Sequence, residues 1–178
     1  EEGRYLGLDG TDDSYLYTLL KKAAGLGEVT IVVHTENIEL VNRFRREAMA
    51  AGKDTLRDWS FVKPPFTEAE SVVRAMYFAE HLGARIYIPH LSTRMALDEV
   101  RRWRKRYDKV WVETCPHYLM LSTDDYTRVP GVIAVNPPVR EKRNQAPIWA
   151  ALLDGTIDLI ATDHAPHTPE EKTRNDIW

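Results

Sequence analysis

Histidine and aspartate side chains recur in this sequence directly after short apolar runs. His34 and His90 each end such a run, and Asp163 follows another. A single histidine at the end of a strand is usually a hydrogen-bonded structural residue, but repetition at several strand ends favours a shared site. If these strands are parallel, their carboxyl ends meet at one edge, where ligands and catalytic groups collect. Imidazole and carboxylate together suit zinc, iron or manganese, and a catalytic metal lowers the pKa of a bound water.

Other polar residues near the same strand ends have two interpretations each. Glu36 and Asn37 follow His34 and either begin the next helix or orient the histidine. His117 and Cys115 are expected to pack, although the thiol could also act as a soft ligand or nucleophile. Asn136 opens the stretch NPPVR, which predicts either a rigid loop or an amide held at the rim of a pocket.

Strand-like and helix-like patterns alternate along the chain. The expected strands are 29–34, 85–90, 109–115 and 156–163, and the expected helices are 12–27, 36–52, 67–83, 92–107 and 144–155. Thr67 and Glu70 form a capping-box pattern at the start of the third helix, after an expected loop at 53–65. Such alternation indicates a parallel sheet with crossover helices. A flavodoxin-like open sheet and a (β/α)8 barrel both fit it.

Bulk composition narrows the class of protein. The chain has 178 residues, 43% of them hydrophobic and 29% charged, as in a soluble globular domain. A net charge of −3 without a basic block argues against nucleic-acid or membrane partners. The lone Cys115 fits a reducing compartment, so the cytoplasm is expected. Both ends look cut, and we expect a fragment of a larger domain.

The stretch ATDHAPHTPEEK, residues 161–172, resembles the dihydroorotase signature. That signature has Gly or Ala, Ser or Thr, Asp, any residue, Ala-Pro-His, and a Lys five positions further on, and every specified position is met. Three further stretches, VHTEN, IPHLST and ETCPHYLMLS, are similar to the same cyclic amidohydrolases. They occur in the family's order, so the resemblance covers essentially the whole chain.

The resemblance implies an α/β fold, a (β/α)8 TIM barrel of the metal-dependent hydrolase type. Residues 1–178 would form a partial amidohydrolase barrel domain, truncated at both ends, with about the C-terminal half (strands 5 to 8) present. It also implies a two-metal site, usually of Zn²⁺. His34 and His90 match the ligands of one metal, and Asp163 matches a ligand of the other. A metal-activated water would attack a ring amide carbonyl, and Asp163 would carry the proton to the leaving nitrogen.

Asn136 and His167 match family positions that hold the ring amide and the carboxylate of the substrate, whereas His117 matches a motif position without a ligand role. His167, four residues after Asp163, and Asn136, where hydantoinase-like relatives more often carry Ser, favour dihydroorotase. The implied reaction is the reversible hydrolysis of dihydroorotate to carbamoyl-aspartate in pyrimidine biosynthesis. The alternatives are a hydantoinase- or allantoinase-type enzyme, or a non-catalytic dihydroorotase-like scaffold.

The family's first-strand His-x-His and fourth-strand bridging Lys or Asp are absent from this chain. The fragment alone is therefore expected to be inactive, because it carries about half of the metal ligands. The expected partners are a small-molecule substrate and either a second copy of the chain, the missing half of the barrel or aspartate transcarbamoylase.

Overall fold

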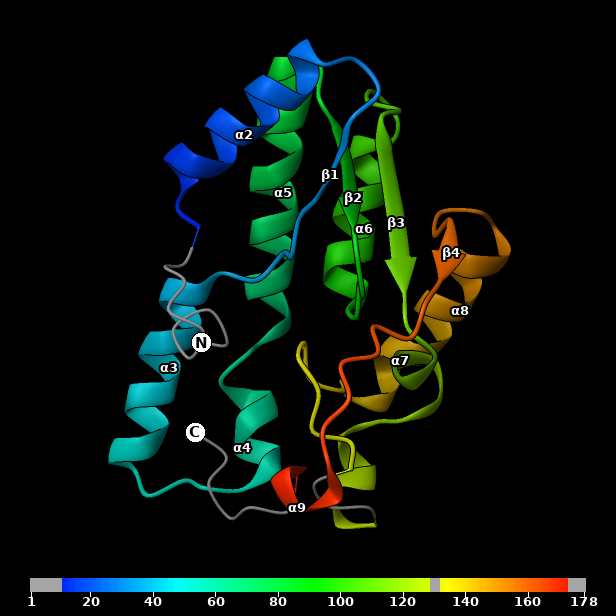
Figure 1. Cartoon of the computed structure of the whole chain (residues 1–178). Coiled ribbons are helices and arrows are strands. Elements are labelled where there is room, and N and C mark those ends of the chain that lie inside the picture. Colours follow the sequence, from blue (N-terminus) through cyan, green and yellow to red (C-terminus); the bar gives the residue numbers. More distant parts are fainter. Residues whose placement is uncertain (1–10, 129–131, 173–178) are drawn as a thin grey trace.

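The fold is built on a parallel sheet of four short strands. The computed structural model describes residues 11–128 and 132–172, and within them the strand order is β1-β2-β3-β4. The strands are β1 (Thr30–Val32), β2 (Arg85–Ile88), β3 (Val110–Thr114) and β4 (Leu159–Ile160). Each strand pairs in parallel with the next one along the chain. All four carboxyl ends therefore point to the same edge of the sheet (Figure 1).

Helices connect the strands and surround them. The bounds are α2 (Asp13–Gly25), α3 (Ile38–Ala50), α4 (Leu56–Phe61), α5 (Pro65–Leu82), α6 (Arg94–Trp103), α7 (Pro116–Met120), α8 (Gln145–Leu153) and α9 (Pro169–Lys172). Two 3-10 helices span Thr123–Thr127 and Lys142–Asn144. Figure 1 shows α5 and α6 running along the sheet, while α3, α4, α7 and α9 gather toward the carboxyl ends of the strands. Over the described part of the chain, no helix is both long and apolar enough to cross a membrane.

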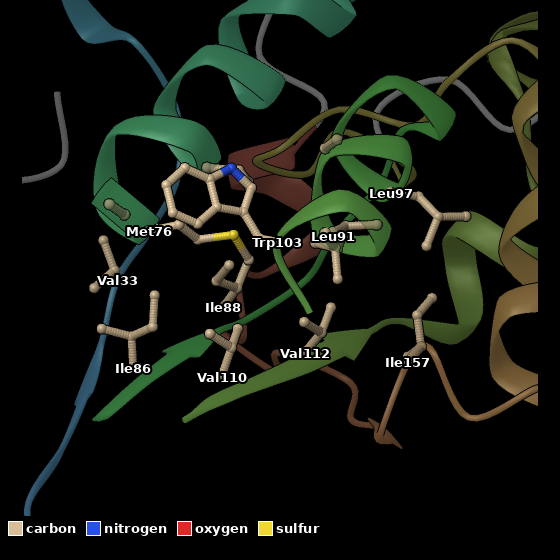
Figure 2. Close-up of a cluster of buried hydrophobic side chains, with 14 of the residues drawn as sticks. Val33, Met76, Ile86, Ile88, Leu91, Leu97, Trp103, Val110, Val112 and Ile157 are labelled. Atoms are coloured by element: carbon tan, nitrogen blue, oxygen red, sulfur yellow. The ribbon is translucent and has the colours of Figure 1, made fainter. Parts of the chain in front are cut away.

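One face of the sheet carries the main hydrophobic core. Alternate residues of β2, Ile86 and Ile88, are fully buried, as is Val112 on β3. They meet Met76 from α5 and Leu97 from α6, which are also fully buried (Figure 2). Burying a side chain of this size stabilises the fold by about 1.5–3 kcal/mol. The core thus fixes which face of each strand turns inward, and with it the direction of the residues that follow each strand.

The expected parallel α/β organisation is confirmed, but three local expectations were wrong. The expected loop at 53–65 contains α4, which begins with a capping box in which the Thr55 backbone N–H donates to Asp58 Oδ2 at 3.0 Å. Helix α5 begins earlier than expected, after Pro64, and the Thr67 hydroxyl donates to the Pro64 carbonyl at 2.8 Å instead of capping. Proline at the first helical position replaces the capping box, because it has no N–H that needs a partner. Helix α7 was not expected.

Removing part of the core should weaken the fold by a measurable amount. We expect Ile88→Ala to lower the free energy of unfolding by about 2–5 kcal/mol, because a fully buried side chain leaves a cavity. Urea denaturation of the protein that carries this chain measures the change. Leu153→Ala is the control, since that side chain is 83% exposed and should change stability by less than about 0.5 kcal/mol. Equal effects of the two substitutions would contradict this assignment of the core.

Candidate functional site

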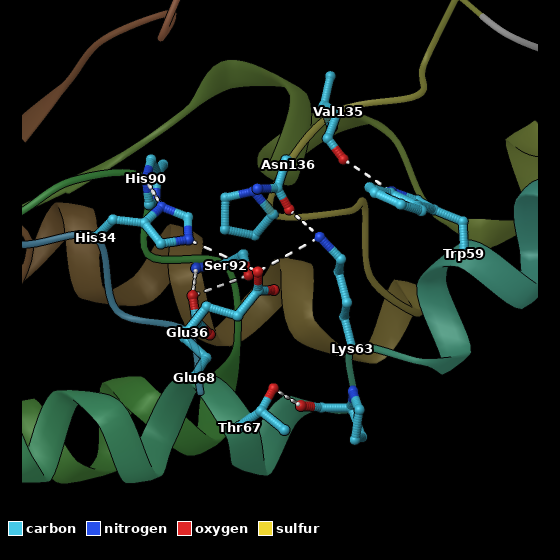
Figure 3. A network of polar contacts seen from close by, with 12 residues as sticks. His34, Glu36, Trp59, Lys63, Thr67, Glu68, His90, Ser92, Val135 and Asn136 are labelled. Atoms are coloured by element: carbon cyan, nitrogen blue, oxygen red, sulfur yellow. Dashed lines mark hydrogen bonds and ion pairs between the residues drawn. The ribbon is translucent and has the colours of Figure 1, made fainter. Parts of the chain in front are cut away.

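His34 and His90 meet at the ends of neighbouring strands. The Val33 backbone N–H donates to the Tyr87 carbonyl at 2.9 Å, which continues the β1–β2 pairing up to the two histidines. His34 Nδ1 then lies 3.0 Å from His90 Nε2, with the ring centroids 4.8 Å apart (Figure 3). His90 is buried, whereas the His34 side chain is 45% exposed. The sequence-based expectation that these two histidines share one site is consistent with this geometry.

The spacing of the two ring nitrogens suits a shared metal ion. Zinc binds imidazole nitrogen at about 2.0–2.1 Å in a tetrahedral arrangement, which separates two such nitrogens by about 3.3 Å. Burial, and next the neighbouring His34, lower the pKa of His90 to about 3. His90 is therefore neutral at physiological pH, as a metal ligand must be. Among residues 11–128 and 132–172, no group of three His, Cys, Asp or Glu side chains could hold a metal. A role of the pair as two ligands of a larger set stays a prediction.

His90 and Asp163 hold costly backbone conformations at strand ends. Their φ angles are +44° and +50°, in the left-handed region that residues other than glycine rarely adopt. Such strain costs about 1–3 kcal/mol per residue and is concentrated at functional sites. His90 Nδ1 is also buried without a hydrogen-bond partner in the described part of the chain, which costs a further ~1–3 kcal/mol. These costs favour a role in function over a role in stability.

Asp163 follows β4, which pairs with β3 and not with the two strands that precede the histidines. The Ala161 backbone N–H donates to the Thr114 carbonyl at 3.1 Å, so the chain leaves β4 alongside the end of β3. Burial lowers the pKa of His117, and the carboxylate of Asp163 opposes that shift. Burial also raises the pKa of Cys115 to about 12, so its thiol stays protonated and fits the interpretation as a small buried residue. A role of Asp163 as a ligand of a second metal stays a prediction.

The two expected substrate-binding residues differ in how firmly they are held. Asn136 is exposed, but its Oδ1 accepts a hydrogen bond from the Lys63 ammonium, and the preceding Val135 carbonyl accepts one from the Trp59 indole at 3.2 Å (Figure 3). His167 is exposed, and its Nδ1 lies 3.8 Å from a carboxylate oxygen of Glu171. The Asn136 side chain is thus held by the buried Lys63, whereas His167 contacts Glu171, an exposed side chain of α9.

Glu36 joins the histidine pair to Lys63, a connection that the sequence did not indicate. Its Oε2 lies 3.7 Å from His34 Nε2 and 3.4 Å from Lys63 Nζ, and the Glu36 and Lys63 side chains are each 4% exposed. Burial raises the pKa of Glu36, but His34 and Lys63 outweigh it and hold the pKa at about 2. The carboxylate therefore stays ionised. Asn37 has the other expected role, because its Oδ1 caps α3 by accepting from the Leu40 N–H at 3.1 Å.

A second buried network supports the same loops. Arg140 Nε donates to Ser92 Oγ at 2.8 Å, and the Ser92 N–H donates to Glu68 Oε1 at 2.8 Å. Arg140 also donates to the Lys63 carbonyl, and Thr93 donates to Glu68 Oε2. Sequence reasoning missed Glu68, although one signal was present: it lies on the same face of α5 as the apolar core residues, where a carboxylate needs buried partners.

The comparisons with known proteins identify relatives of the chain. The chain is 36% identical over 157 residues to the allantoinase of Salmonella gallinarum, an alignment that covers 87% of this chain and 35% of that protein. No protein-family model matches it. The solved L-hydantoinase (dihydropyrimidinase) of Arthrobacter aurescens superimposes with a TM-score of 0.91 at 29% identity, over 96% of this chain and 38% of that one. The chain therefore spans about a third of the length of the curated relatives that it matches.

These relatives belong to the cyclic amidohydrolase superfamily, and the solved ones are amidohydrolase TIM-barrel proteins. A dihydroorotase from Campylobacter jejuni also superimposes, with a TM-score of 0.63 at 17% identity over 92% of this chain and 42% of that one. That identity shows the fold alone. The superfamily expected from the sequence is thus supported by the relatives, whereas dihydroorotase as its particular member is not.

Metal uptake tests the histidine pair directly. We expect His34→Ala and His90→Ala each to weaken zinc binding by at least about 100-fold. Loss of a residue that only supports a metal ligand weakens metal affinity by about 10–100-fold. Competition with a coloured chelator measures the affinity. His81→Ala is the control, because that ring contacts Tyr17 on the helical side of the fold. Unchanged zinc affinity in the two site variants would remove the metal centre from this position.

Proposed function

We propose that this chain carries part of the active site of a metal-dependent cyclic amide hydrolase of the hydantoinase–allantoinase type. The observation that carries the proposal is the convergence of His34 Nδ1 and His90 Nε2, 3.0 Å apart at neighbouring strand ends, in a chain 36% identical to an allantoinase. Zn²⁺ is the metal we propose, in a two-metal site once the rest of the protein is present. Bound zinc supplies a Lewis acid that polarises the amide carbonyl.

The residues of this chain would divide the work of amide hydrolysis. His34 and His90 would bind one metal, and Asp163 would contribute to the other. Asp163 is exposed at its strand end and can carry a proton from the attacking water to the ring nitrogen that leaves. Because Lys63 occupies Asn136 Oδ1, the two N–H groups of the Asn136 amide remain to donate to a ring carbonyl of the substrate.

Two classes of cyclic amide are candidate substrates, and they differ in the ring that is opened. Overall similarity favours hydantoin, dihydropyrimidine or allantoin, because an allantoinase is 36% identical and an L-hydantoinase (dihydropyrimidinase) 29% identical to the chain, whereas a dihydroorotase is 17% identical. One observation favours dihydroorotate as the second candidate: every specified position of the signature at 161–172 is met. In that case His167 would bind the substrate carboxylate, which requires it to turn away from Glu171.

The whole protein is proposed to be a (β/α)8 barrel to which residues 1–178 contribute strands 5 to 8. The partner that the proposal requires is the remainder of the barrel, whether on the same chain or on another. A second copy of the protein or aspartate transcarbamoylase is a further proposed partner. The single cysteine favours the cytoplasm as the location.

A substrate panel and one substitution test the proposal. The zinc-loaded full-length protein should hydrolyse at least one of hydantoin, dihydropyrimidine, allantoin and dihydroorotate. Asp163→Ala should lower kcat/KM for that ring by at least about 10⁴-fold. Loss of a general base lowers the rate by up to about 10⁴-fold, and the substitution would also remove a metal ligand. Ring opening is followed by its ultraviolet absorbance or by release of the product.

Asp154→Ala is the matched control for this substitution, since Asp154 is an exposed aspartate whose contacts are with Arg101 and Thr156. It should leave the rate unchanged. Retained turnover by Asp163→Ala in metal-replete buffer would exclude the proposed proton transfer. Hydrolysis of dihydroorotate alone would favour the second candidate.

The isolated 178-residue chain should show no turnover of any of these rings, even with excess zinc. Its described residues bring His34 and His90 together without a group of three possible metal ligands, and strands β1 and β4 have edges without a neighbouring strand there. Assays with purified chain, alone and mixed with a separately expressed remainder of the barrel, measure this. Turnover by the chain alone, together with a cooperative unfolding transition, would show that it needs no further strands.

A further inference from the structure

Lys63 occupies a central position between the histidine pair and the substrate loop. It lies between α4 and α5, is 3% exposed, and its ammonium lies 4.0 Å from the centroid of the Trp59 ring. One hydrogen bond from this ammonium goes to Glu36 at 3.4 Å, and another goes to Asn136. A buried ammonium that is held by three groups has little freedom, so each contact constrains the other two.

The contacts form a continuous series across the site. Figure 3 shows His90 beside His34, His34 beside Glu36, Glu36 beside Lys63, and Lys63 beside Asn136. These residues come from four separate segments: the loop after β1, the turn before α5, the loop after β2 and the loop that precedes the second 3-10 helix. The β2 histidine completes the series at one end. A single path of polar contacts thus links the proposed metal ligands to the proposed substrate-binding amide.

Stability alone does not account for a buried pair of this kind. Removing a carboxylate and an ammonium from water often costs more free energy than their mutual attraction recovers. Apolar residues of similar volume can often replace such a pair without loss of stability. Neither charge here is needed to close the core, because the main apolar cluster lies against α5 and α6 on the sheet. The pair is therefore better explained by the positions that it gives to His34 and Asn136.

We propose that Glu36 and Lys63 form a positioning pair that couples metal binding by His34 to substrate binding by Asn136, an inference that rests on the proposed function. Glu36 faces the Nε2 side of the His34 ring and favours the tautomer with the proton there, which leaves a lone pair on Nδ1, on the side of His90, that would bind the metal. Lys63 donates to Asn136 Oδ1 and so directs the amide N–H groups outward.

The coupling follows from the position of Lys63 between the two. When Lys63 is lost, Glu36 loses a partner and is freer to move away from His34. At the same time Asn136 loses the donor that fixes its amide. A single substitution should therefore weaken the binding of both zinc and substrate, and a purely structural role predicts neither effect in a folded protein.

Lys63→Met in the full-length protein is the test. Zinc affinity, measured by chelator competition without substrate, should fall by about 10–100-fold, the usual loss when a group that supports a metal ligand is removed. With zinc saturating, KM for the hydrolysed ring should rise about 10-fold, while kcat changes by less than about 3-fold, because ground-state and transition-state binding are lost together. Arg43→Met, which breaks an exposed pair with Glu47 at 2.9 Å, is the control and should change neither quantity.

A double-mutant cycle shows whether Lys63 acts through Asn136. In an Asn136→Ala background, Lys63→Met should raise KM by less than about 2-fold, because the amide that Lys63 positions is already absent. Independent, multiplying effects on KM would overturn the positioning of Asn136. Unchanged zinc affinity in folded Lys63→Met protein would overturn the coupling to His34.

A variant that does not fold and an unmodified protein without activity have different consequences for the proposal. If Lys63→Met does not fold, as judged by circular dichroism, Glu36→Gln replaces it: this variant keeps the side-chain shape, and it should weaken zinc binding by about 10-fold or refute the role of the pair. If the unmodified protein hydrolyses none of the rings, the proposed function fails. The zinc measurements then still decide whether the Glu36–Lys63 pair supports His34.

Discussion

The parallel register between β1 and β2 is the constraint on which the site depends. Val32 pairs with Tyr87, and the strands leave the sheet side by side, so His34 and His90 arrive at the same edge. A slip of one residue would turn every side chain of β1 to the opposite face and separate the two rings. Ile31 and Val33, two apolar residues on one face of the β1 segment, pack into the main core and oppose such a slip. The hydrophobic core, which includes Val33 beside His34 and Leu91 beside His90, thus sets the geometry of the polar site.

Unfavourable backbone conformations and buried charges at the site offset part of the stability that this core supplies. His90 combines a left-handed backbone with a buried ring nitrogen that has no partner in the described residues, and Asp163 repeats the backbone strain at another strand end. Glu36 and Lys63 bring buried charges to the same edge. Residues in unfavourable local conformations are tolerated where the surrounding structure holds them firmly. They are concentrated at functional sites. Their common location at the strand ends is a stronger indication of function than any one of them.

The sequence was informative where structure is local and failed where it depends on distant partners. Apolar periodicity predicted the four strands and the main helices, and position after a strand predicted the convergence of His34 and His90. Lys63 could not be recognised, because its partners Glu36 and Asn136 lie 27 and 73 residues away in the chain. Glu68 also binds residues distant in the sequence, but its place on the buried face of α5 was a local signal that was overlooked. Helix α4 was missed because it has only 6 residues, too few to show a period against the turn-forming residues around it.

The disagreement between the local signature and the overall similarity has a structural explanation. The residues of the signature at 161–172 are largely exposed, as are His34 and Asn136, and exposed loop residues change more readily than the scaffold that holds them. Lys63, Glu68 and Arg140 are instead buried beneath these loops and bind several segments at once. Under the proposed function, the residues that contact the ring would lie among these exposed positions. The buried network would hold the proposed metal ligands and the Asn136 loop in place, so a dihydroorotase-like local signature can stand on a scaffold that is more similar overall to hydantoinases and an allantoinase.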